Sequence, residues 1–408
     1  MKCRHCNFEV DQSFVDLGAS PPSNAYLTFD ALSAPETYYP LRALVCTNCW
    51  LVQTEDFARA DELFNSGYAY FSSISLTWLE HAAAYAKMII ARLALHPASF
   101  VIEVASNDGY LLKNFRSASI PCLGIEPTES TALAAEHLGI PVRREFFGSA
   151  LATELAAEGK LADLIVGNNV YAHVPDINDF SLGLKTALRP GGVITLEFPH
   201  LMRLIEHTQF DTIYHEHFSY LSLHALSHIF ASVGLRVWDV EQLSTHGGSL
   251  RVYGCHANDT RAATEKVCQV LEEEQKGGLL DSRTYTNFQQ RANRLKDDLV
   301  TFLITQKQMG KAVAAYGAAA KGNTLLNYAG VRGDLLPYVC DAAHSKQGKF
   351  LPGTRIPIVS PDVMRERRPD CVIILPWNLA NEVTTLHNYV RDWGGRFVIA
   401  VPELREIR

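Results

Sequence analysis

The sequence predicts an α/β protein built from three parts. Two Cys-x-x-Cys pairs occupy the first fifty residues. Two separate successions of short apolar runs follow, each alternating with segments of helical spacing. A charged, helical stretch over residues 261–309 divides them. Strands that alternate with helices predict open, mainly parallel sheets covered on both faces, so we expect a small cysteine-bearing module followed by two α/β domains.

Composition limits the classes of function. A chain of 408 residues with 47% hydrophobic and 20% charged residues is typical of a globular protein with several cores. No run approaches the roughly 20 apolar residues that cross a bilayer, and the first ten residues lack the apolar core of a secretory signal. A formal charge of -7 argues against a broad nucleic-acid surface. We therefore expect a cytoplasmic protein that binds neither membranes nor nucleic acid.

The two cysteine pairs are Cys3/Cys6 and Cys46/Cys49, with thirty-nine residues between them. In a reducing compartment such thiols are more often metal ligands than disulfides. Thiolates two residues apart can bind one tetrahedral Zn²⁺ from one turn, and two pairs complete a closed shell with no open catalytic position. The pattern predicts structural zinc. The alternative is four isolated buried thiols.

The elements follow in order. Helical spacing over residues 75–95 leads into an apolar strand and a turn at residues 100–115. Further apolar runs of the first sheet cover residues 122–128, 161–170, 191–199, 233–243 and 247–256. Those of the second sheet cover residues 311–330, 336–348, 356–361, 370–378 and 394–402. We expect a module over residues 1–70, a central domain over 71–256, and a helical linker with a smaller α/β domain over 257–408.

The turn over residues 103–109 points to a nucleoside site. It places small side chains and a helix N-terminus at a strand end, and the next strand ends at Glu126, where an acid can bind both hydroxyls of a ribose. Two acids without a glycine-rich phosphate loop favour S-adenosylmethionine over NAD. A plain strand-to-helix turn is the alternative. The predicted cofactor-binding residues are Glu103, Ser106, Asn107, Asp108, Gly109, Glu126, Pro127, Asn168 and Asn169.

Residues 213–220, Ile-Tyr-His-Glu-His-Phe-Ser-Tyr, concentrate groups that can move protons. A neutral imidazole can remove a proton made acidic by an adjacent carbonyl, while tyrosine or glutamate can stabilise the enolate that results. Two other interpretations stay open. His215 and His217 could bind a metal, or Glu216 could satisfy a core histidine.

Several motifs together resemble the nucleotide-sugar C-methyltransferases of antibiotic and cell-surface deoxysugar pathways, over essentially the whole chain. They are Cys3-x-x-Cys6, Cys46-x-x-Cys49, Ala-Ser-Asn-Asp-Gly at 105–109, Gly-Ile-Glu-Pro at 124–127, Tyr-His-Glu-His at 214–217, Thr-His-Gly-Gly-Ser at 245–249 and Gly-Ala-Ala-Ala-Lys-Gly at 317–322. The resemblance implies an N-terminal zinc module, a central class I methyltransferase domain that binds S-adenosylmethionine, and a Rossmann-like C-terminal domain. The nucleotide-sugar is then expected between the last two.

The resemblance also implies roles for individual residues. His217 matches the general base, and Tyr214 and Glu216 match neighbours that hold the sugar and support the enolate. Further matches to active-site or substrate-binding positions are Tyr68, His173, His246, Ser249, Lys321, Asn323, Trp377 and Asn378, of which Lys321 and Asn323 are expected at the pyrophosphate. Ala105 stands where the family carries a glycine.

The sequence therefore predicts a C-methyltransferase that deprotonates and methylates the carbon next to the keto group, C3 by preference, of a nucleotide-linked 4-keto-deoxysugar. An O- or N-methyltransferase on a sugar or metabolite is the nearest alternative. A non-catalytic nucleotide-binding scaffold is a second, and a nicotinamide-dependent enzyme is disfavoured because the first turn lacks the required glycines. We expect a monomer.

Overall fold

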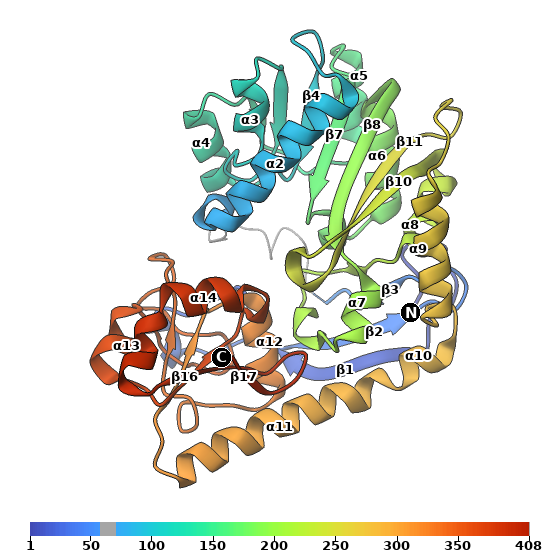
Figure 1. The fold of residues 1–408 in the computed structure, drawn as a ribbon. Helices are drawn as coiled ribbons and strands as arrows, with labels where there is room; N and C mark the ends of the chain where they lie inside the picture. The colour runs from blue at the N-terminus through green and yellow to red at the C-terminus, as the bar shows by residue number, and fades with distance from the viewer. Residues whose placement is uncertain (58–70, 408) are drawn as a thin grey trace.

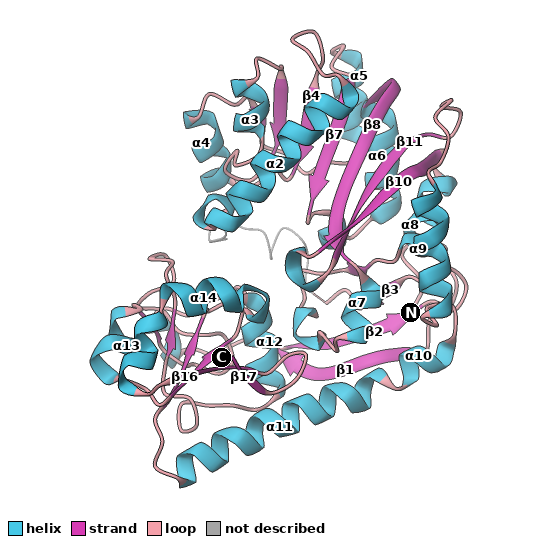
Figure 2. Ribbon diagram, viewed as in Figure 1, coloured by secondary structure: helices cyan, strands magenta, loops and turns pink. Residues whose placement is uncertain are grey.

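The computed structural model describes residues 1–57 and 71–407, and this part of the chain contains three β-sheets (Figures 1 and 2). The α/β class predicted from the sequence is confirmed. Within the described residues no helix is both long and apolar enough to cross a membrane.

The N-terminal sheet is antiparallel and is completed by a strand from much later in the chain. Its order is β1 (Ser13–Ser20), β2 (Tyr39–Val45), β3 (Val52–Thr54) and β9 (Ser219–Tyr220). Val52 pairs with Tyr220 and Gln53 with Ser219. The segment with two histidines, which precedes β9, is thereby hydrogen-bonded to the N-terminal module.

The central sheet has seven strands. Their order is β10 (Leu235–Leu243), β11 (Ser249–His256), β8 (Leu188–Pro199), β7 (Ala162–Asn168), β4 (Val101–Val104), β5 (Cys122–Ile125) and β6 (Val142–Arg143). The pairs from β6 to β8 are parallel, whereas β11 is antiparallel to both neighbours. The β10–β11 hairpin therefore brings its turn to the carboxyl end of β8.

Helices cover both faces of this sheet, because alternate strand residues point to opposite sides. Ile102 and Ile165 join one apolar cluster, and Val101 and Leu164 join another. The helices are α2 (Leu76–Leu93), α3 (Leu112–Ser117), α4 (Glu129–His137), α5 (Ser149–Ala157), α6 (Ile177–Ala187), α7 (Leu201–Glu206) and α8 (Leu223–Ser232). Single 3₁₀ turns lie at residues 30–33, 72–74, 171–173, 210–212 and 245–247.

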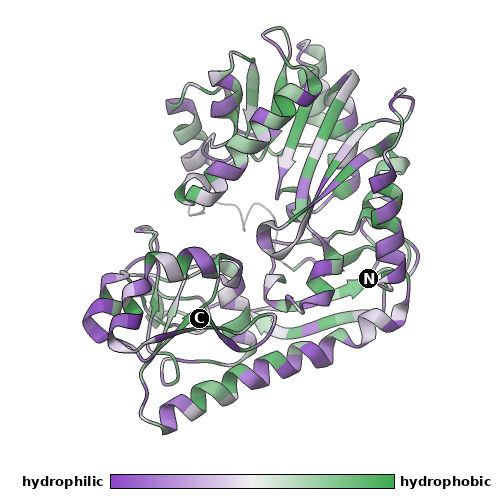
Figure 3. Ribbon diagram, viewed as in Figure 1, coloured by the Kyte–Doolittle hydropathy of each residue, from purple (hydrophilic) through white to green (hydrophobic). Residues whose placement is uncertain are grey.

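Three helices lead to the C-terminal part: α9 (Glu265–Lys276), α10 (Ser282–Thr286) and α11 (Phe288–Gln308). Figure 1 shows α11 running beside the N-terminal sheet toward the C-terminal sheet. Figure 3 shows hydrophobic and hydrophilic residues alternating along it, as expected for a helix with one buried face. Phe14 of β1 stacks on Phe288 with ring centroids 4.3 Å apart, so the linker joins the two parts through a shared core.

The C-terminal sheet has six strands in the order β14 (Ile358–Val359), β13 (Val339–Cys340), β12 (Val313–Tyr316), β15 (Cys371–Ile374), β16 (Arg396–Ile399) and β17 (Arg405–Ile407). Only the edge strand β17 is antiparallel to its neighbour. The remaining elements are α12 (Ala320–Tyr328), α13 (Asp362–Arg367), α14 (Ala380–Leu386) and 3₁₀ turns at residues 377–379 and 388–393. The second doubly wound pattern predicted from the sequence is present.

A buried carboxylate fastens the linker to the central part. Glu274 of α9 accepts a 2.7 Å hydrogen bond from Nε2 of His200. It also accepts the backbone N–H groups of Leu223 and His224 at 2.6 and 2.9 Å, where α8 begins. Both His200 and Glu274 are 1% exposed. One side chain thus satisfies three buried donors.

We predict that Glu274→Leu lowers the free energy of unfolding by about 3–5 kcal/mol, because the substitution leaves these donors buried without an acceptor. The matched control is Glu272→Leu on the same helix, which removes only an exposed ion pair with Lys276. The control should change stability by no more than about 0.5 kcal/mol. Denaturant unfolding of both variants measures the difference, and equal losses would contradict the role given to Glu274.

Candidate active site

The turn after β4 adopts an uncommon backbone. Ala105, Asn107 and Gly109 have φ angles of 57°, 48° and 77°. Positive φ brings Cβ close to the following carbonyl oxygen, which costs roughly 1–2 kcal/mol for most residues, while glycine adopts it freely and asparagine is tolerated. This explains why a glycine would suit position 105. At Gly109 a Cβ would also lie 2.5 Å from the side chain of Ile140.

Three carboxylates surround this turn. Glu126 accepts the backbone N–H groups of Asn107 and Thr128, each at 2.9 Å, and so closes the turn. Asp108 accepts the N–H of Ser73 at 3.0 Å. Burial, together with the charges of Asp108 and Glu126, raises the pKa of Glu103 well above its usual range. The group of acids therefore favours a cationic ligand.

Several buried polar atoms near the turn have no hydrogen-bond partner among the residues that the structure describes. They are the hydroxyl oxygen of Ser106, one carboxylate oxygen of Asp108, both amide atoms of Asn168 and the amide oxygen of Asn169. Buried polar atoms are normally satisfied, so a cluster of unsatisfied ones suits a polar ligand. S-adenosylmethionine carries an ammonium, a sulfonium and ribose hydroxyls, and the residues fit it.

The orientation of His217 is fixed on both sides of its ring. Nδ1 lies 2.9 Å from the carbonyl oxygen of Thr212, and a carbonyl only accepts, so Nδ1 carries the proton. Nε2 is then an acceptor, and the Tyr214 hydroxyl donates to it at 2.8 Å. Burial, reinforced by the neighbouring His173, holds the pKa of His217 well below 6.5. The ring is neutral at pH 7, with a basic nitrogen on one defined side.

A second histidine packs against the first. The rings of His173 and His217 lie 4.5 Å apart, edge to face, and Nδ1–H of His173 donates to the Glu216 carbonyl at 2.7 Å. Burial lowers the pKa of His173 to about 4. The Glu216 carboxylate accepts from the backbone N–H and the amide of Asn24 at 3.3 and 3.2 Å, and burial raises its pKa. The predicted residues His173, Glu216 and His217 therefore lie together. Tyr68, also predicted, lies outside the described residues.

A metal at His215 and His217 finds no support in this geometry. Nε2 of His215 donates to the Pro40 carbonyl at 3.2 Å, Nδ1 of His217 donates to the Thr212 carbonyl, and Nε2 of His217 accepts from Tyr214, so within the described residues only Nδ1 of His215 lacks a partner. In residues 1–57 and 71–407 the only group of three or more potential ligands is the set of four cysteines.

The C-terminal part contributes Lys321, whose charge is close enough to His217 to lower the pKa of that histidine. Nζ of Lys321 donates to the Asn378 amide oxygen at 2.7 Å and lies 4.7 Å from the Trp377 ring centroid. Nε1 of Trp377 donates in turn to Asp211 at 2.7 Å. Burial raises the pKa of Asp211 to about 6 and lowers that of Lys321. The central and C-terminal parts therefore meet through polar side chains.

The β10–β11 turn also approaches Trp377. His246 has a φ of 53°, and its Nε2 accepts from the Asn169 amide at 3.1 Å. A Cβ at Gly247 would lie 2.3 Å from the Trp377 ring, so only glycine permits this approach. Two other predicted residues are used internally. Ser249 donates to the Thr245 carbonyl, and Asn323, which is 1% exposed, donates to the Ser23 carbonyl at 2.6 Å.

Several residues of this region were missed in the sequence. Asp211 and Asn24 contact predicted residues, yet each is a single polar residue outside the predicted helices and strands and carries no periodic signal. Glu197, at the carboxyl end of β8, is fully buried and accepts from His81 and Arg251 at 2.9 and 2.8 Å. Glu197 could have been predicted from the sequence, because it is a carboxylate at the end of an apolar run.

The four cysteines come together as predicted. Their sulfur atoms all lie within 4.8 Å of one another, with Cys3 to Cys49 at 3.6 Å and Cys6 to Cys46 at 3.5 Å. A tetrahedral zinc with Zn–S bonds of about 2.3 Å separates its sulfurs by about 3.8 Å. Burial raises the pKa of Cys46 to about 11, so a cation is needed to keep four adjacent thiolates ionised. The residues fit zinc.

Family comparisons agree with the three parts. Residues 3–64 match a zinc binding domain, residues 78–240 a methyltransferase domain, and residues 244–402 a C-methyltransferase C-terminal domain. The chain is 34% identical over 406 residues to the C-methyltransferase NovU of Streptomyces niveus, a match that covers 100% of this chain and 96% of that protein.

Solved structures match less than half of this chain, at lower similarity. An S-adenosylmethionine-dependent methyltransferase from Anabaena variabilis is 14% identical, with a TM-score of 0.35, over 43% of this chain and 84% of that one. The magnesium protoporphyrin IX methyltransferase of Synechocystis with bound SAH is 13% identical, with a TM-score of 0.35, over 43% of this chain and 82% of that one. From its full-length match to NovU and its three domain matches, the chain belongs to the family of S-adenosylmethionine-dependent C-methyltransferases with an N-terminal zinc-binding domain.

Proposed function

We propose that the enzyme methylates the carbon next to the keto group, C3, of a nucleotide-linked 4-keto-deoxysugar, with His217 as the base. The observation that carries this proposal is the orientation of His217. Its Nδ1–H is held by the Thr212 carbonyl, and its Nε2 is a proton acceptor beside Tyr214. Carbon methylation needs a base because a C–H bond must be broken, whereas many oxygen and nitrogen acceptors need little assistance.

The proton-transfer step follows from this geometry. Nε2 of His217 takes the α-proton, the C–H electron pair becomes the C=C bond of an enolate, and the keto oxygen becomes negative. That negative charge favours the imidazolium, which offsets the effect of burial on the pKa of His217. The Tyr214 hydroxyl, which donates to Nε2 in the free enzyme, can turn to donate to the enolate oxygen. His217 later releases the proton to solvent.

S-adenosylmethionine supplies the methyl group, whose bond to sulfur breaks as the new carbon–carbon bond forms. We assign its ribose to Glu126 and its cationic methionine part to the region of Glu103 and Asp108. Asn168 and Asn169 would orient it through the amide atoms that have no partner in the described part of the chain. Ser106, Asn107, Gly109 and Pro127 form the backbone turns on either side. Positioning is the main contribution of these residues.

We assign the nucleotide part of the substrate to the C-terminal part. The Lys321 ammonium lies where a pyrophosphate could replace its hydrogen bond to Asn378, and Trp377 offers a ring face beside it. Asn323 lies on the same helix, and Ser249 and His246 flank the turn that contacts Trp377. A substrate that spans these groups and His217 would carry its keto-sugar at the histidine.

The direct test is incubation with S-adenosylmethionine and a panel of nucleotide-linked 4-keto-deoxysugars. Mass spectrometry should find a gain of one methyl group in one or more of them. Nucleotide-sugars without the keto group serve as controls, because their ring protons are not acidic. Methylation of such a control, or of none of the panel, would contradict the proposed substrate class.

We predict that His217→Asn folds and binds both ligands but loses about 10²–10⁴-fold of methyl transfer and of exchange of the sugar's α-proton with deuterium from solvent. An amide cannot take the proton. Because exchange does not require the methyl donor, losing both activities places the residue at deprotonation. His215→Asn and His173→Asn are the matched comparisons. Near-normal exchange in the His217 variant, with exchange abolished in one of the others, would move the base to that histidine.

The pH dependence of kcat/KM follows from the lowered pKa of His217. Protonated Nε2 cannot accept a proton, and a depressed pKa keeps the ring neutral to lower pH. We therefore predict that kcat/KM stays level as the pH falls through about 6.5, the ordinary pKa of histidine, and decreases only below it. Circular dichroism at each pH shows that the protein remains folded. A decrease centred at or above about 6.5 would contradict the proposed environment of the base.

We propose further that one zinc ion, held by the four cysteines, stabilises the N-terminal module and takes no part in the chemistry. Metal analysis should find about one zinc per chain, and Cys46→Ser should lower both the zinc content and the stability of the module. Cys268→Ser, at an exposed cysteine outside the cluster, is the control. Full zinc content in the Cys46 variant would exclude this ligand set.

A further inference from the structure

We propose that Arg4, between the first two cysteines of the zinc cluster, is a positioning residue for proton transfer. It holds the backbone segments that carry His217 and His173 at a fixed separation. The inference rests on the proposed role of His217 as the base. It gives the N-terminal module a part in the reaction besides stability.

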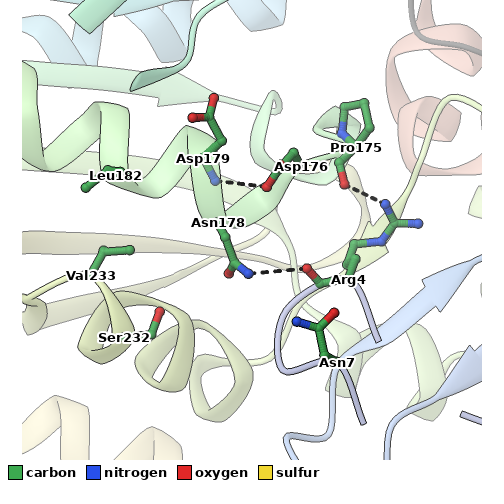
Figure 4. A pocket seen from close by; sticks show the side chains of 9 residues that line it. All are labelled: Arg4, Asn7, Pro175, Asp176, Asn178, Asp179, Leu182, Ser232 and Val233. Carbon is green, nitrogen blue, oxygen red and sulfur yellow. Dashed lines mark hydrogen bonds between the residues drawn. The ribbon is translucent and has the colours of Figure 1, made fainter. Parts of the chain in front are cut away.

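The Arg4 guanidinium bridges two segments that are far apart in the sequence. Its Nη2 donates to the Thr54 carbonyl at 2.9 Å and to Asp56 at 2.7 Å, while its Nη1 donates to the Pro175 carbonyl at 2.7 Å. The side chain is 5% exposed, and it lies over the Phe218 ring, 5.4 Å from the centroid. Figure 4 shows the guanidinium turned toward Pro175.

Each bridged segment leads directly to a histidine. On one side, the Thr54 hydroxyl donates to the His217 carbonyl at 3.0 Å, and the Thr54 N–H donates to the Phe218 carbonyl at 3.1 Å. On the other side, Pro175 lies two residues after His173. The Phe218 N–H donates to the Ala172 carbonyl at 2.8 Å, which joins the two segments again. The guanidinium therefore closes a ring of contacts that joins the backbone segments carrying the two histidines.

The backbone of Arg4 is itself well fixed. Its N–H donates to the Gln53 side chain at 2.9 Å, and the cysteines on either side belong to the zinc cluster. Asn178 of α6 donates to the Arg4 carbonyl at 3.4 Å (Figure 4). It also donates to the His5 carbonyl at 2.8 Å. Because the Arg4 backbone is fixed, its side chain can hold the carbonyls of Thr54 and Pro175 in fixed positions.

Arginine suits this task better than lysine. Its planar fork offers several donors in fixed directions, so one side chain can bind carbonyls on two segments at once, whereas an ammonium is a single point charge on a flexible stem. A misplacement of about 1 Å between base and substrate can cost up to about 10²-fold in rate. Small shifts of His217 relative to His173 are therefore measurable in kcat.

The test compares Arg4→Ala with Arg42→Ala. Arg42 lies on β2 of the N-terminal sheet, is exposed, and pairs with Glu55 at 2.6 and 2.8 Å, so it controls for the loss of an arginine from the same module. We expect Arg4→Ala to lower kcat and α-proton exchange about 10–100-fold, with zinc content and both KM values changed less than about twofold. Arg42→Ala should retain normal kcat. A normal kcat in Arg4→Ala would overturn the inference.

Chemical rescue separates positioning from general stability. A pocket of about 730 Å³, open to solvent, borders Arg4, and Asn7 and Asp176 also line it, so added guanidinium ion has a route to the vacated place (Figure 4). Guanidinium should restore part of kcat in Arg4→Ala, and Arg4→Lys should be intermediate. If Arg4→Ala loses zinc or fails to fold, Arg4→Gln is used. Failure of guanidinium to restore activity in a folded variant would indicate a structural role only.

The double variant Arg4→Ala/His217→Asn distinguishes a failure of this inference from a failure of the proposed function. If Arg4 acts through His217, then Arg4→Ala should slow exchange little further in a His217→Asn background. An equal loss in both backgrounds would overturn the inference while leaving His217 as the base. Normal exchange in His217→Asn alone would instead reject the proposed function.

Discussion

The hydrogen bond between Nδ1 of His217 and the Thr212 carbonyl is the interaction on which the candidate site depends. It fixes the tautomer of the neutral ring, so Nε2 is the acceptor in the free enzyme. Burial keeps the ring neutral, and the Tyr214 hydroxyl occupies the side on which a proton would arrive. Without that carbonyl, His217 would still be buried, but the orientation of its ring would be undefined. The proposed deprotonation at carbon depends on a base that is directed in this way.

The surroundings of this histidine come from all three parts of the chain. The strand β9 joins the N-terminal sheet, Asn24 of that module binds Glu216, and the central and C-terminal parts meet where Gly247 contacts Trp377. The long helix α11 and the shared core beneath it hold the N-terminal and C-terminal sheets together. Two substrates of different charge can thus be bound by separate parts, with the carboxylates near Glu103 on one side and Lys321 on the other. Such a division suits the proposed pair of substrates, a cationic methyl donor and an anionic nucleotide-sugar.

The sequence predicted the fold class, the order of the sheets and the cysteine cluster, because these depend on local periodicity and spacing. It also indicated the turn at residues 105–109, and positive φ at Ala105 now explains the glycine expected there. It did not predict that β9, a strand of only two residues, completes the N-terminal sheet, since so short a strand has no period of its own. Asp211 was missed because its contact to Trp377 exists only after two distant segments meet. The division after residues 70 and 256 stays a prediction.

Whether Nε2 of His217 can take a proton depends on the protonation state of the ring in the free protein. Nitrogen NMR of protein labelled at histidine distinguishes a protonated ring nitrogen from a bare one, and the His217→Asn spectrum identifies the signal by its loss. At neutral pH we expect a neutral ring with hydrogen on Nδ1 and none on Nε2. A charged ring, or hydrogen on Nε2 alone, would contradict it, because neither form could accept a proton from the side that faces Tyr214.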